Sequence, residues 1–401
     1  MNIHNYDLRY QQTVKRVQKA NISERNKELI MRVTNDLVLE GLSKPRLIKY
    51  MGVLTIVAKM IQKDLDTADI NDLKKIVTSI QQRGDYSPWT KQMYKVIIRR
   101  FYKWIAGTKT YPEIVQWISI RTSRSEMKLP SEGELLTEED IQKLLRVTIH
   151  PRDKAFVSIL WESGARISEI GNMKIGNIAF DVHGTVITVQ GKTGSRKIRL
   201  LFSTQYLSTW LGSHPLKDNP EAPVWIDLGD NELLEYDGYR KMLQRIFQLA
   251  GIKKRCNPHI FRHSRATFMA HHLTEFQMNQ YFGWIQGSDM PSTYVHMSGK
   301  NIEEALFKMN GISVEQKKEE SKLIPIHCPR CDVLNSNENK FCCKCGGILD
   351  IKHSMELEEK RKQEQEVRTG ADQLMNELLK DKDVQRLLME KMVALRGSFS
   401  V

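Results

Sequence analysis

The sequence has little of what a membrane or secreted protein needs. None of its 401 residues lies in an uninterrupted apolar run approaching the roughly 18 residues that a membrane-spanning helix requires. Residues 1–20 contain no apolar stretch of the kind that a secretory signal carries. No repeat recurs at the periods of about 20 to 50 residues that mark solenoid proteins. We therefore expect a soluble, cytoplasmic protein without a membrane partner.

Two common catalytic signatures are also missing. The segment from Gly191 to Gly194, Gly-Lys-Thr-Gly, is the nearest approach to a nucleotide-binding phosphate loop, but it lacks the earlier glycine that such a loop requires. The sequence has no carboxylate cluster of the kind that holds two metal ions in many nucleases. These absences argue against ATP-driven chemistry and against two-metal phosphodiester hydrolysis.

Cysteine is scarce, and five of the six cysteines lie between residues 328 and 345. Such clustering fits a metal site in a reducing compartment better than a disulfide framework. Two Cys-x-x-Cys pairs separated by ten residues are typical of a zinc ribbon, with iron as the minor competitor at an all-thiolate site. Cys343 offers an alternative ligand, but its spacing from Cys345 does not suit a ribbon. We predict a structural zinc ion held by four ligands, Cys328, Cys331, Cys342 and Cys345.

What the sequence has in excess is positive charge. The formal net charge is +13 and the isoelectric point is about 9.3. This balance favours polyanionic partners, nucleic acid among them, although charge alone says nothing about the fold. Hydrophobic residues make up 40% of the chain, which is enough to build ordinary globular cores.

The sequence divides into a helical part, a mixed part and a charged tail. Capping side chains followed by apolar residues at helical spacing predict helix starts at Ser23, Ser43 and Ser87. Alternating residues on either side of Gly191–Ser195 predict a β-hairpin. The predicted units are a helical domain (1–120), a linker (121–134), a second domain (135–312), the cysteine module (325–350) and a charged C-terminal helix (351–401). The C-terminal segment suits either an oligomerisation or docking helix or a frayed tail.

The segment Asn257-Pro-His-Ile-Phe-Arg262 points to phosphate chemistry. Asparagine is a good helix cap and proline suits the first helical position. His259 and Arg262 then lie on one face of the first turns, at a helix N-terminus whose free amides and dipole favour an anion. An imidazole and a guanidinium together suit a phosphate that must be both bound and protonated. In isolation, the same pattern also fits a capped helix with a partly buried histidine.

The motifs that precede and follow this segment, and the order in which they occur, make it more informative. Upstream, Arg166 follows a glycine break and precedes Glu169, and Lys192 lies at the hairpin turn. Downstream, Trp284 follows a glycine and Tyr294 lies ten residues later. In this order the motifs resemble those of the tyrosine recombinase family, which includes the phage integrases. The resemblance covers the whole second domain, and the first domain resembles the helical core-binding domain of the family.

The resemblance implies the fold class and several catalytic roles. It implies a mainly α fold with a small antiparallel β element, in which a mixed α/β catalytic domain follows the helical core-binding domain. Arg166 and Arg262 would clamp the non-bridging oxygens of the scissile phosphate, because their planar guanidiniums match its geometry. Tyr294 would be the nucleophile that forms a covalent 3′-phosphotyrosyl link.

Three further residues would move or donate protons. The resemblance implies that His259 is the general base and that Lys192 protonates the departing 5′ hydroxyl. Trp284 stands where many relatives carry a second histidine, and an indole N–H donates a hydrogen bond but transfers no proton. We expect Glu169 to orient a catalytic side chain, and we assign His263 to ordinary packing or surface roles.

The predicted function is site-specific recombination of double-stranded DNA without ATP or a catalytic metal. The family resemblance implies a homotetramer on two DNA sites, a monomer or dimer off DNA, and a nucleoid-associated protein. An appended zinc ribbon is similar to that of archaeal integrases, which suggests an archaeal or mobile-element origin. Two alternatives remain open, a type IB topoisomerase-like relaxing enzyme and a non-catalytic DNA-binding regulator.

Overall fold

The computed structural model describes residues 2–121, 130–295, 306–307, 309–310, 323–337, 339–342 and 344–397. Most of the predicted linker at 121–134, most of the chain between 296 and 322, and Cys343 lie outside the described residues. The described part is mainly helical, with two small antiparallel sheets, which confirms the predicted fold class. Two large hydrophobic cores form, one among the N-terminal helices and one in the second part of the chain.

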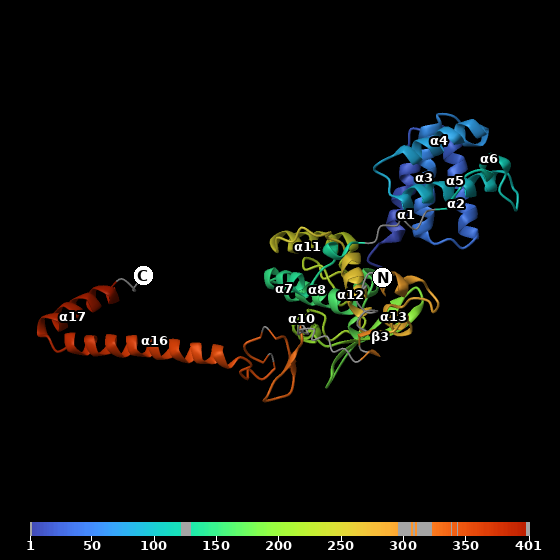
Figure 1. Cartoon of the computed structure of the whole chain (residues 1–401). Helices are drawn as coiled ribbons and strands as arrows, with labels where there is room; N and C mark the ends of the chain where they lie inside the picture. Colours follow the sequence, from blue (N-terminus) through green and yellow to red (C-terminus); the bar gives the residue numbers. More distant parts are fainter. Residues whose placement is uncertain are drawn as a thin grey trace.

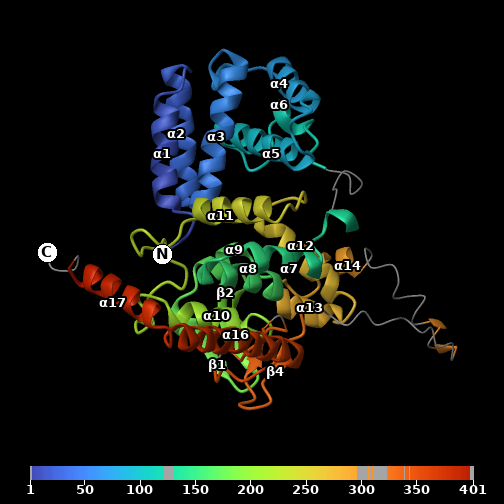
Figure 2. The same cartoon turned by 90° about the vertical axis from the view of Figure 1, so that its left-hand side faces the viewer.

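The N-terminal core is built by helices whose starts follow from their capping residues. Ser23 and Ser87 accept hydrogen bonds from the backbone N–H of Asn26 and Thr90, and a proline is the second residue of the helix after Ser43 and the first residue of the helix after Ser87. Figures 1 and 2 show these helices grouped together, apart from the rest of the chain. The helices are α1 (Tyr6–Gln18), α2 (Glu24–Leu39), α3 (Lys44–Ile61), α4 (Ile70–Gln82), α5 (Pro88–Ile105) and α6 (Glu113–Gln116).

The second core lies between helices and a three-stranded sheet. Strands β1 (Ile178–Asp181), β2 (Gly184–Gly191) and β3 (Gly194–Leu200) pair in order, and both pairings are antiparallel. Gly191 pairs with Gly194, so Lys192 and Thr193 form the predicted hairpin turn. The helices are α7 (Glu138–Val147), α8 (Pro151–Ser163), α9 (Ile167–Gly171), α10 (Thr204–Gly212), α11 (Tyr236–Leu249), α12 (Pro258–Met269), α13 (Glu275–Phe282) and α14 (Met290–Val295).

The first residues of the chain insert into this second core. Ile3 is 1% exposed and belongs to the hydrophobic cluster of α8 and α11, although α1 belongs to the other core. Its N–H donates to Asn172 Oδ1 at 2.9 Å, and its carbonyl accepts from the Tyr236 N–H at 2.8 Å. Residues 2–5 therefore form a strap that links the N-terminal helices to the second core.

We expect Ile3→Asp to release this strap. Burying a carboxylate costs more than the roughly 1.5–3 kcal/mol that a buried isoleucine contributes, so the strap should detach rather than remain buried. Hydrogen exchange should then rise in peptides covering residues 2–8 and at the Tyr236 amide. Leu8→Asp is the matched control, because Leu8 is 47% exposed on α1. Unchanged exchange in Ile3→Asp would contradict the strap.

The C-terminal part consists of a small cysteine module and two helices. Strands β4 (Ile326–His327) and β5 (Leu334–Asn335) pair antiparallel, and the module contacts α10, where Gln205 Oε1 accepts from the Ser336 N–H at 2.6 Å. Helices α16 (Ile351–Leu378) and α17 (Lys382–Gly397) follow, and Figure 1 shows α16 extending away from the rest of the chain. Within the described residues, no helix combines the length and the apolar character needed to cross a membrane.

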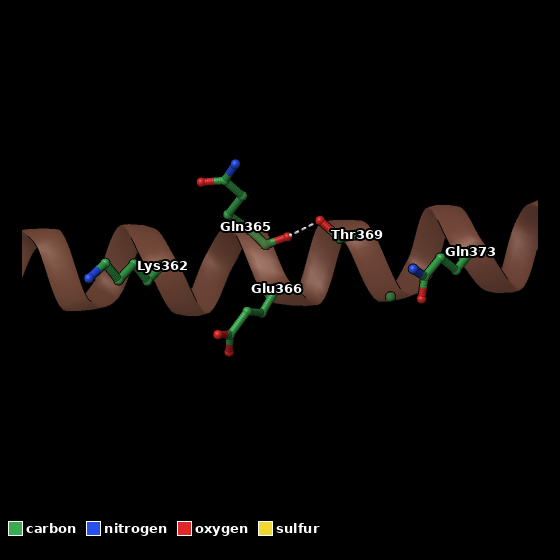
Figure 3. Close-up of a pocket in the computed structure, with 6 residues that line it drawn as sticks. Lys362, Gln365, Glu366, Thr369 and Gln373 are labelled. Carbon is green, nitrogen blue, oxygen red and sulfur yellow. Dashed lines mark hydrogen bonds between the residues drawn. The ribbon is translucent and has the colours of Figure 1, made fainter.

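A shallow hollow along α16 is lined by residues of that helix alone. Its Lys362, Gln365, Glu366, Thr369 and Gln373 follow one another along the helix, as Figure 3 shows. The hydrogen bond drawn there runs from the Thr369 hydroxyl to the Gln365 carbonyl of the same helix, at 2.8 Å. All five residues are exposed. One solvated helix face does not enclose a ligand, so the second core is the better candidate for a functional site.

Candidate active site

A tight turn between α8 and α9 positions Arg166. Gly164 caps α8 in the left-handed region, at φ +53°, and a Cβ placed there would lie 2.7 Å from Phe282 Cε1, so only glycine fits. Arg166 caps α9, and its N–H and guanidinium both donate to Glu169, at 2.9 and 2.8 Å. The half-buried Arg166 side chain is thus held by a carboxylate one turn away.

Glu169 also binds a second arginine, from strand β3. Arg196 Nη2 donates to Glu169 Oε2 at 2.8 Å, and Arg196 Nε donates to the Tyr281 carbonyl at 2.9 Å. Burial alone would raise the pKa of the Glu169 carboxyl, but the hydrogen bonds and charges of Arg196 and Arg166 outweigh it and hold that pKa below its usual value. Glu169 therefore stays ionised and orients two guanidiniums, which agrees with the expected orienting role.

Arg262 lies beside the same turn. Asn257 caps α12 by accepting the Ile260 N–H at 2.9 Å, with Pro258 at the first helical position, as the sequence predicts. The buried Arg262 guanidinium donates to the Gly164 carbonyl at 3.0 Å and to the Phe282 carbonyl at 2.8 Å. Burial first, and then the charge of Arg166, lowers the pKa of Arg262 to about 10, so it remains charged at neutral pH. The structure thus places two arginines from distant segments next to each other.

Tyr294 packs against Trp284, which also lies beside Arg262. Its ring stacks on Trp284 with the planes 5° apart and the centroids 5.6 Å apart, and Arg262 Cζ lies 5.3 Å from the Trp284 centroid. The Tyr294 side chain is 2% exposed. Burial raises the pKa of the Tyr294 hydroxyl, and the charge of Arg262 opposes that rise. Trp284 is therefore the surface that fixes the plane of the phenol.

The imidazole that contacts Tyr294 is His263. Its Nδ1 lies 2.8 Å from the Tyr294 hydroxyl oxygen, which is hydrogen-bond distance. His263 follows His259 by four residues and so lies on the same face of α12. The sequence interpretation assigned His263 to packing, yet this helical spacing was a signal that could have identified it.

His259 is an exposed residue in the otherwise buried first turn of α12, and it lies close to both arginines. Desolvation lowers the pKa of His259, and the positive charges of Arg262 and Arg166 lower it further, so the neutral imidazole is favoured. His259 is therefore exposed beside the arginine pair, whereas the buried phenol lies against His263.

Lys192 is exposed at the turn of the β2–β3 hairpin, beside the segment that carries Trp284. The hydroxyl of its neighbour Thr193 donates to the Gly283 carbonyl at 3.2 Å, which holds the turn against the end of α13. Gly283 has φ +63°, and a Cβ there would lie 2.8 Å from Arg196 Nη1. The structure therefore holds the hairpin turn beside the segment that carries Trp284, with Lys192 exposed.

The four cysteines of the two Cys-x-x-Cys pairs gather in one place. Their sulfur atoms all lie within 4.8 Å of one another, and the Cys328–Cys345 and Cys331–Cys342 pairs are each 3.6 Å apart. Gly347 lies close to the thiols, because a Cβ there would be 3.3 Å from Cys345 Sγ and 3.5 Å from Cys328 Sγ. Four thiols in a close group fit a tetrahedral metal ion.

Comparison with known proteins shows which proteins this chain is similar to in sequence. Residues 134–301 match the family model described as the phage integrase family. The chain is 26% identical to the tyrosine recombinase XerC of Lactobacillus delbrueckii subsp. bulgaricus over 197 residues, which cover 46% of this chain and 64% of that protein. It is 25% identical to the tyrosine recombinase XerA of Pyrococcus furiosus over 288 residues, which cover 71% of this chain and 94% of that protein.

Two solved structures share the fold at low sequence identity. One is the XerH site-specific recombinase bound to its palindromic difH substrate, with a TM-score of 0.55 and 18% identity, covering 77% of this chain and 97% of that one. The other is a lambda integrase dimer bound to a COC′ core site, with a TM-score of 0.54 and 14% identity, covering 67% of this chain and 76% of that one. These two similarities show a shared fold.

Proposed function

Since residues 134–301 match its model, this chain belongs to the phage integrase family of tyrosine recombinases, and we propose that it is a site-specific DNA recombinase. The observation that carries the proposal is the gathering of Arg166, Arg262 and Tyr294, which lie far apart in the sequence, around one small region. Two fixed positive charges beside a phenol suit attack on a phosphodiester.

In the proposed reaction the Tyr294 oxygen attacks the scissile phosphorus. An oxygen–phosphorus bond forms to the tyrosine while the bond to the 5′ oxygen breaks, which leaves a 3′-phosphotyrosyl link and a 5′ hydroxyl. The guanidiniums of Arg166 and Arg262 stabilise the negative charge that grows on the non-bridging oxygens. The covalent link keeps the energy of the broken bond, so the reverse attack by another 5′ hydroxyl rejoins DNA without ATP.

The remaining site residues take supporting roles in this proposal. Lys192, exposed at the hairpin turn, donates the proton that the departing 5′ oxygen needs. His259, exposed in the first turn of α12 near both arginines, would contact the phosphate. Trp284 holds the phenol plane by stacking and offers an indole N–H donor. The sequence hypothesis made His259 the general base, and that role remains a prediction, whereas the imidazole in contact with the Tyr294 hydroxyl is that of His263.

We propose that the cysteine module binds one structural zinc ion. Cys328, Cys331, Cys342 and Cys345 would hold it, and four thiolate ligands leave no open position for chemistry. When bound, the ion would link the turn between β4 and β5, which carries Cys328 and Cys331, to the later segment that carries Cys342 and Cys345. The module contacts α10 through Gln205 and Tyr206, so its folding would stabilise that side of the catalytic part.

The zinc assignment predicts a cysteine-specific loss of metal. Cys328→Ser should abolish bound zinc in elemental analysis, whereas Cys256→Ser should retain it, because Cys256 lies outside the cluster. Chelation of the wild type should raise hydrogen exchange across residues 323–337, because structural zinc supplies about 10–16 kcal/mol of folding free energy to small modules. Equal zinc contents in the two variants would contradict the assignment.

The partner and the assembly follow from the same proposal. We propose double-stranded DNA as the substrate and a tetramer on two DNA sites as the active assembly, supported by the DNA-bound neighbours, one of which is a lambda integrase tetramer on a Holliday junction. Residues 1–120 would form the core DNA-binding domain, 135–312 the catalytic domain, 325–350 the ribbon and 351–401 a C-terminal helical segment. A mobile-element origin and association with the nucleoid belong to this proposal too.

Covalent capture tests the proposal and finds the DNA site in the same experiment. The protein is incubated with fragmented genomic DNA and denatured, and the DNA that remains attached to protein is sequenced. We expect one short sequence to be enriched, with the protein joined to its 3′ phosphate. Strand exchange between two plasmid sites would mark a recombinase, and supercoil relaxation without exchange would mark the topoisomerase-like alternative. Absence of any adduct would leave only DNA-binding roles.

A further inference from the structure

The imidazole against the nucleophile has no role in the reaction described so far. His263 Nδ1 lies 2.8 Å from the Tyr294 oxygen, and the two rings are 5.9 Å apart at a tilt of 38°. That tilt and separation are not a face-to-face stack, so the contact is a hydrogen bond between one nitrogen and one oxygen. We propose that His263 is the proton acceptor that holds and activates Tyr294. The inference rests on the proposed recombinase function and deepens it.

The aromatic stack leaves the phenol little freedom to point elsewhere. Phe282 stacks on Trp284 with centroids 4.9 Å apart, and Trp284 stacks on Tyr294 in turn. Arg262 lies 5.2 Å from the Phe282 centroid and also donates to the Phe282 carbonyl, so the stack and the arginine are mutually fixed. The phenol oxygen is therefore presented to His263 by a rigid surface.

With His263 as the proton acceptor, every proton that moves during cleavage has a donor and an acceptor. The Tyr294 O–H donates to Nδ1 of a neutral His263 whose proton is on Nε2. As the tyrosine oxygen bonds to phosphorus, its proton passes to Nδ1, and the 5′ oxygen that departs takes a proton from Lys192. Religation reverses both transfers, so His263 returns its proton to the phenol. His259, exposed beside the arginine pair, is then left to contact the phosphate.

The charges around His263 favour the neutral form that this step requires. Burial lowers the pKa of His263, and His259, Arg262 and Arg255 on its own side add to that effect, while Tyr294 faces it from α14. A base must be unprotonated to accept a proton, so cleavage should slow as pH falls through the His263 pKa, which lies below its ordinary value of 6.5. Above that pKa the rate should not depend on this group.

The test compares two substitutions at the same atom position. In single-turnover cleavage of a nicked duplex that carries the captured site, His263→Ala removes both the hydrogen bond and the base. His263→Asn keeps a polar group near the Nδ1 position but cannot take the proton. We expect both variants to form the covalent adduct about 10²- to 10⁴-fold more slowly than the wild type, the range for loss of a general base. His272→Asn, an exposed histidine just beyond α12, is the matched control and should cleave normally.

Two further readouts separate a proton acceptor from a merely structural histidine. The low-pH fall in rate should vanish in His263→Asn and persist in His259→Asn. A duplex with sulfur in place of the bridging 5′ oxygen needs no proton on its leaving group, so it should rescue Lys192→Ala and leave His263→Asn slow. Thermal melting and DNA binding of His263→Asn should match the wild type.

These experiments distinguish failure of the His263 assignment from failure of the proposed recombinase function. If the wild type forms no adduct on any site, the recombinase proposal itself fails. If the wild type forms one, and His263→Asn retains more than a third of its rate or is rescued by the sulfur substrate, the assignment of His263 is overturned.

Discussion

Tyr294→Phe is expected to abolish the covalent protein–DNA adduct, by more than about 10⁴-fold, because a phenyl ring offers no nucleophile. The substitution removes one oxygen and keeps the ring that stacks on Trp284 at 5.6 Å. Packing should therefore survive, and the variant should still bind the DNA site. The measurement is adduct formation on the nicked duplex, with DNA affinity determined in parallel.

Tyr236→Phe provides the matched control for this loss. Tyr236 opens α11 and its ring lies against His4, so the same atom is deleted outside the site. That variant should form adduct at the wild-type rate. Adduct formation that persists in Tyr294→Phe, with the protein attached through another residue, would contradict the assignment of the nucleophile and remove the basis of the proposed chemistry.

Local signals in the sequence predicted much of this structure. Helices begin where Ser23, Ser43 and Ser87 predict them, because capping and proline act within one turn. The start of α12 follows in the same way from Asn257 and Pro258. The hairpin turn at Lys192 follows from two alternating segments separated by glycines.

Contacts between distant segments were not predictable in this way. His263 and Tyr294 are 31 residues apart, and their contact depends on how α13 and α14 fold back onto α12. Ile3 is one apolar residue in a polar segment, so no periodicity marks it, yet it is buried in the second core. In the C-terminal segment, the sequence left open a docking or oligomerisation helix and a frayed tail, and whether leucines such as Leu374 and Leu387 are exposed depends on tertiary contacts.

Replacement of Arg262 by glutamine is expected to slow cleavage by about 10³-fold or more, since an arginine that stabilises charge on a transferring phosphoryl group has an effect of that order. Lysine should restore little of the activity, because its single ammonium cannot span both carbonyls that Arg262 contacts, those of Gly164 and Phe282. Arg240→Gln, on the exposed surface of α11, is the control for loss of one positive charge.

The structure also gives Arg262 a supporting role, which has to be separated from its electrostatic one. Without the guanidinium, the Gly164 and Phe282 carbonyls lose their partner, at a cost of about 1–3 kcal/mol each where they stay buried. A scissile methylphosphonate, which lacks the negative charge of a phosphate, distinguishes the two effects. If Arg262 acts by neutralising that charge, the uncharged substrate should narrow the gap between Arg262→Gln and the wild type to within about tenfold. A gap that stays the same would mean that Arg262 holds the turn and the aromatic stack in place, since a change in the DNA cannot repair the protein.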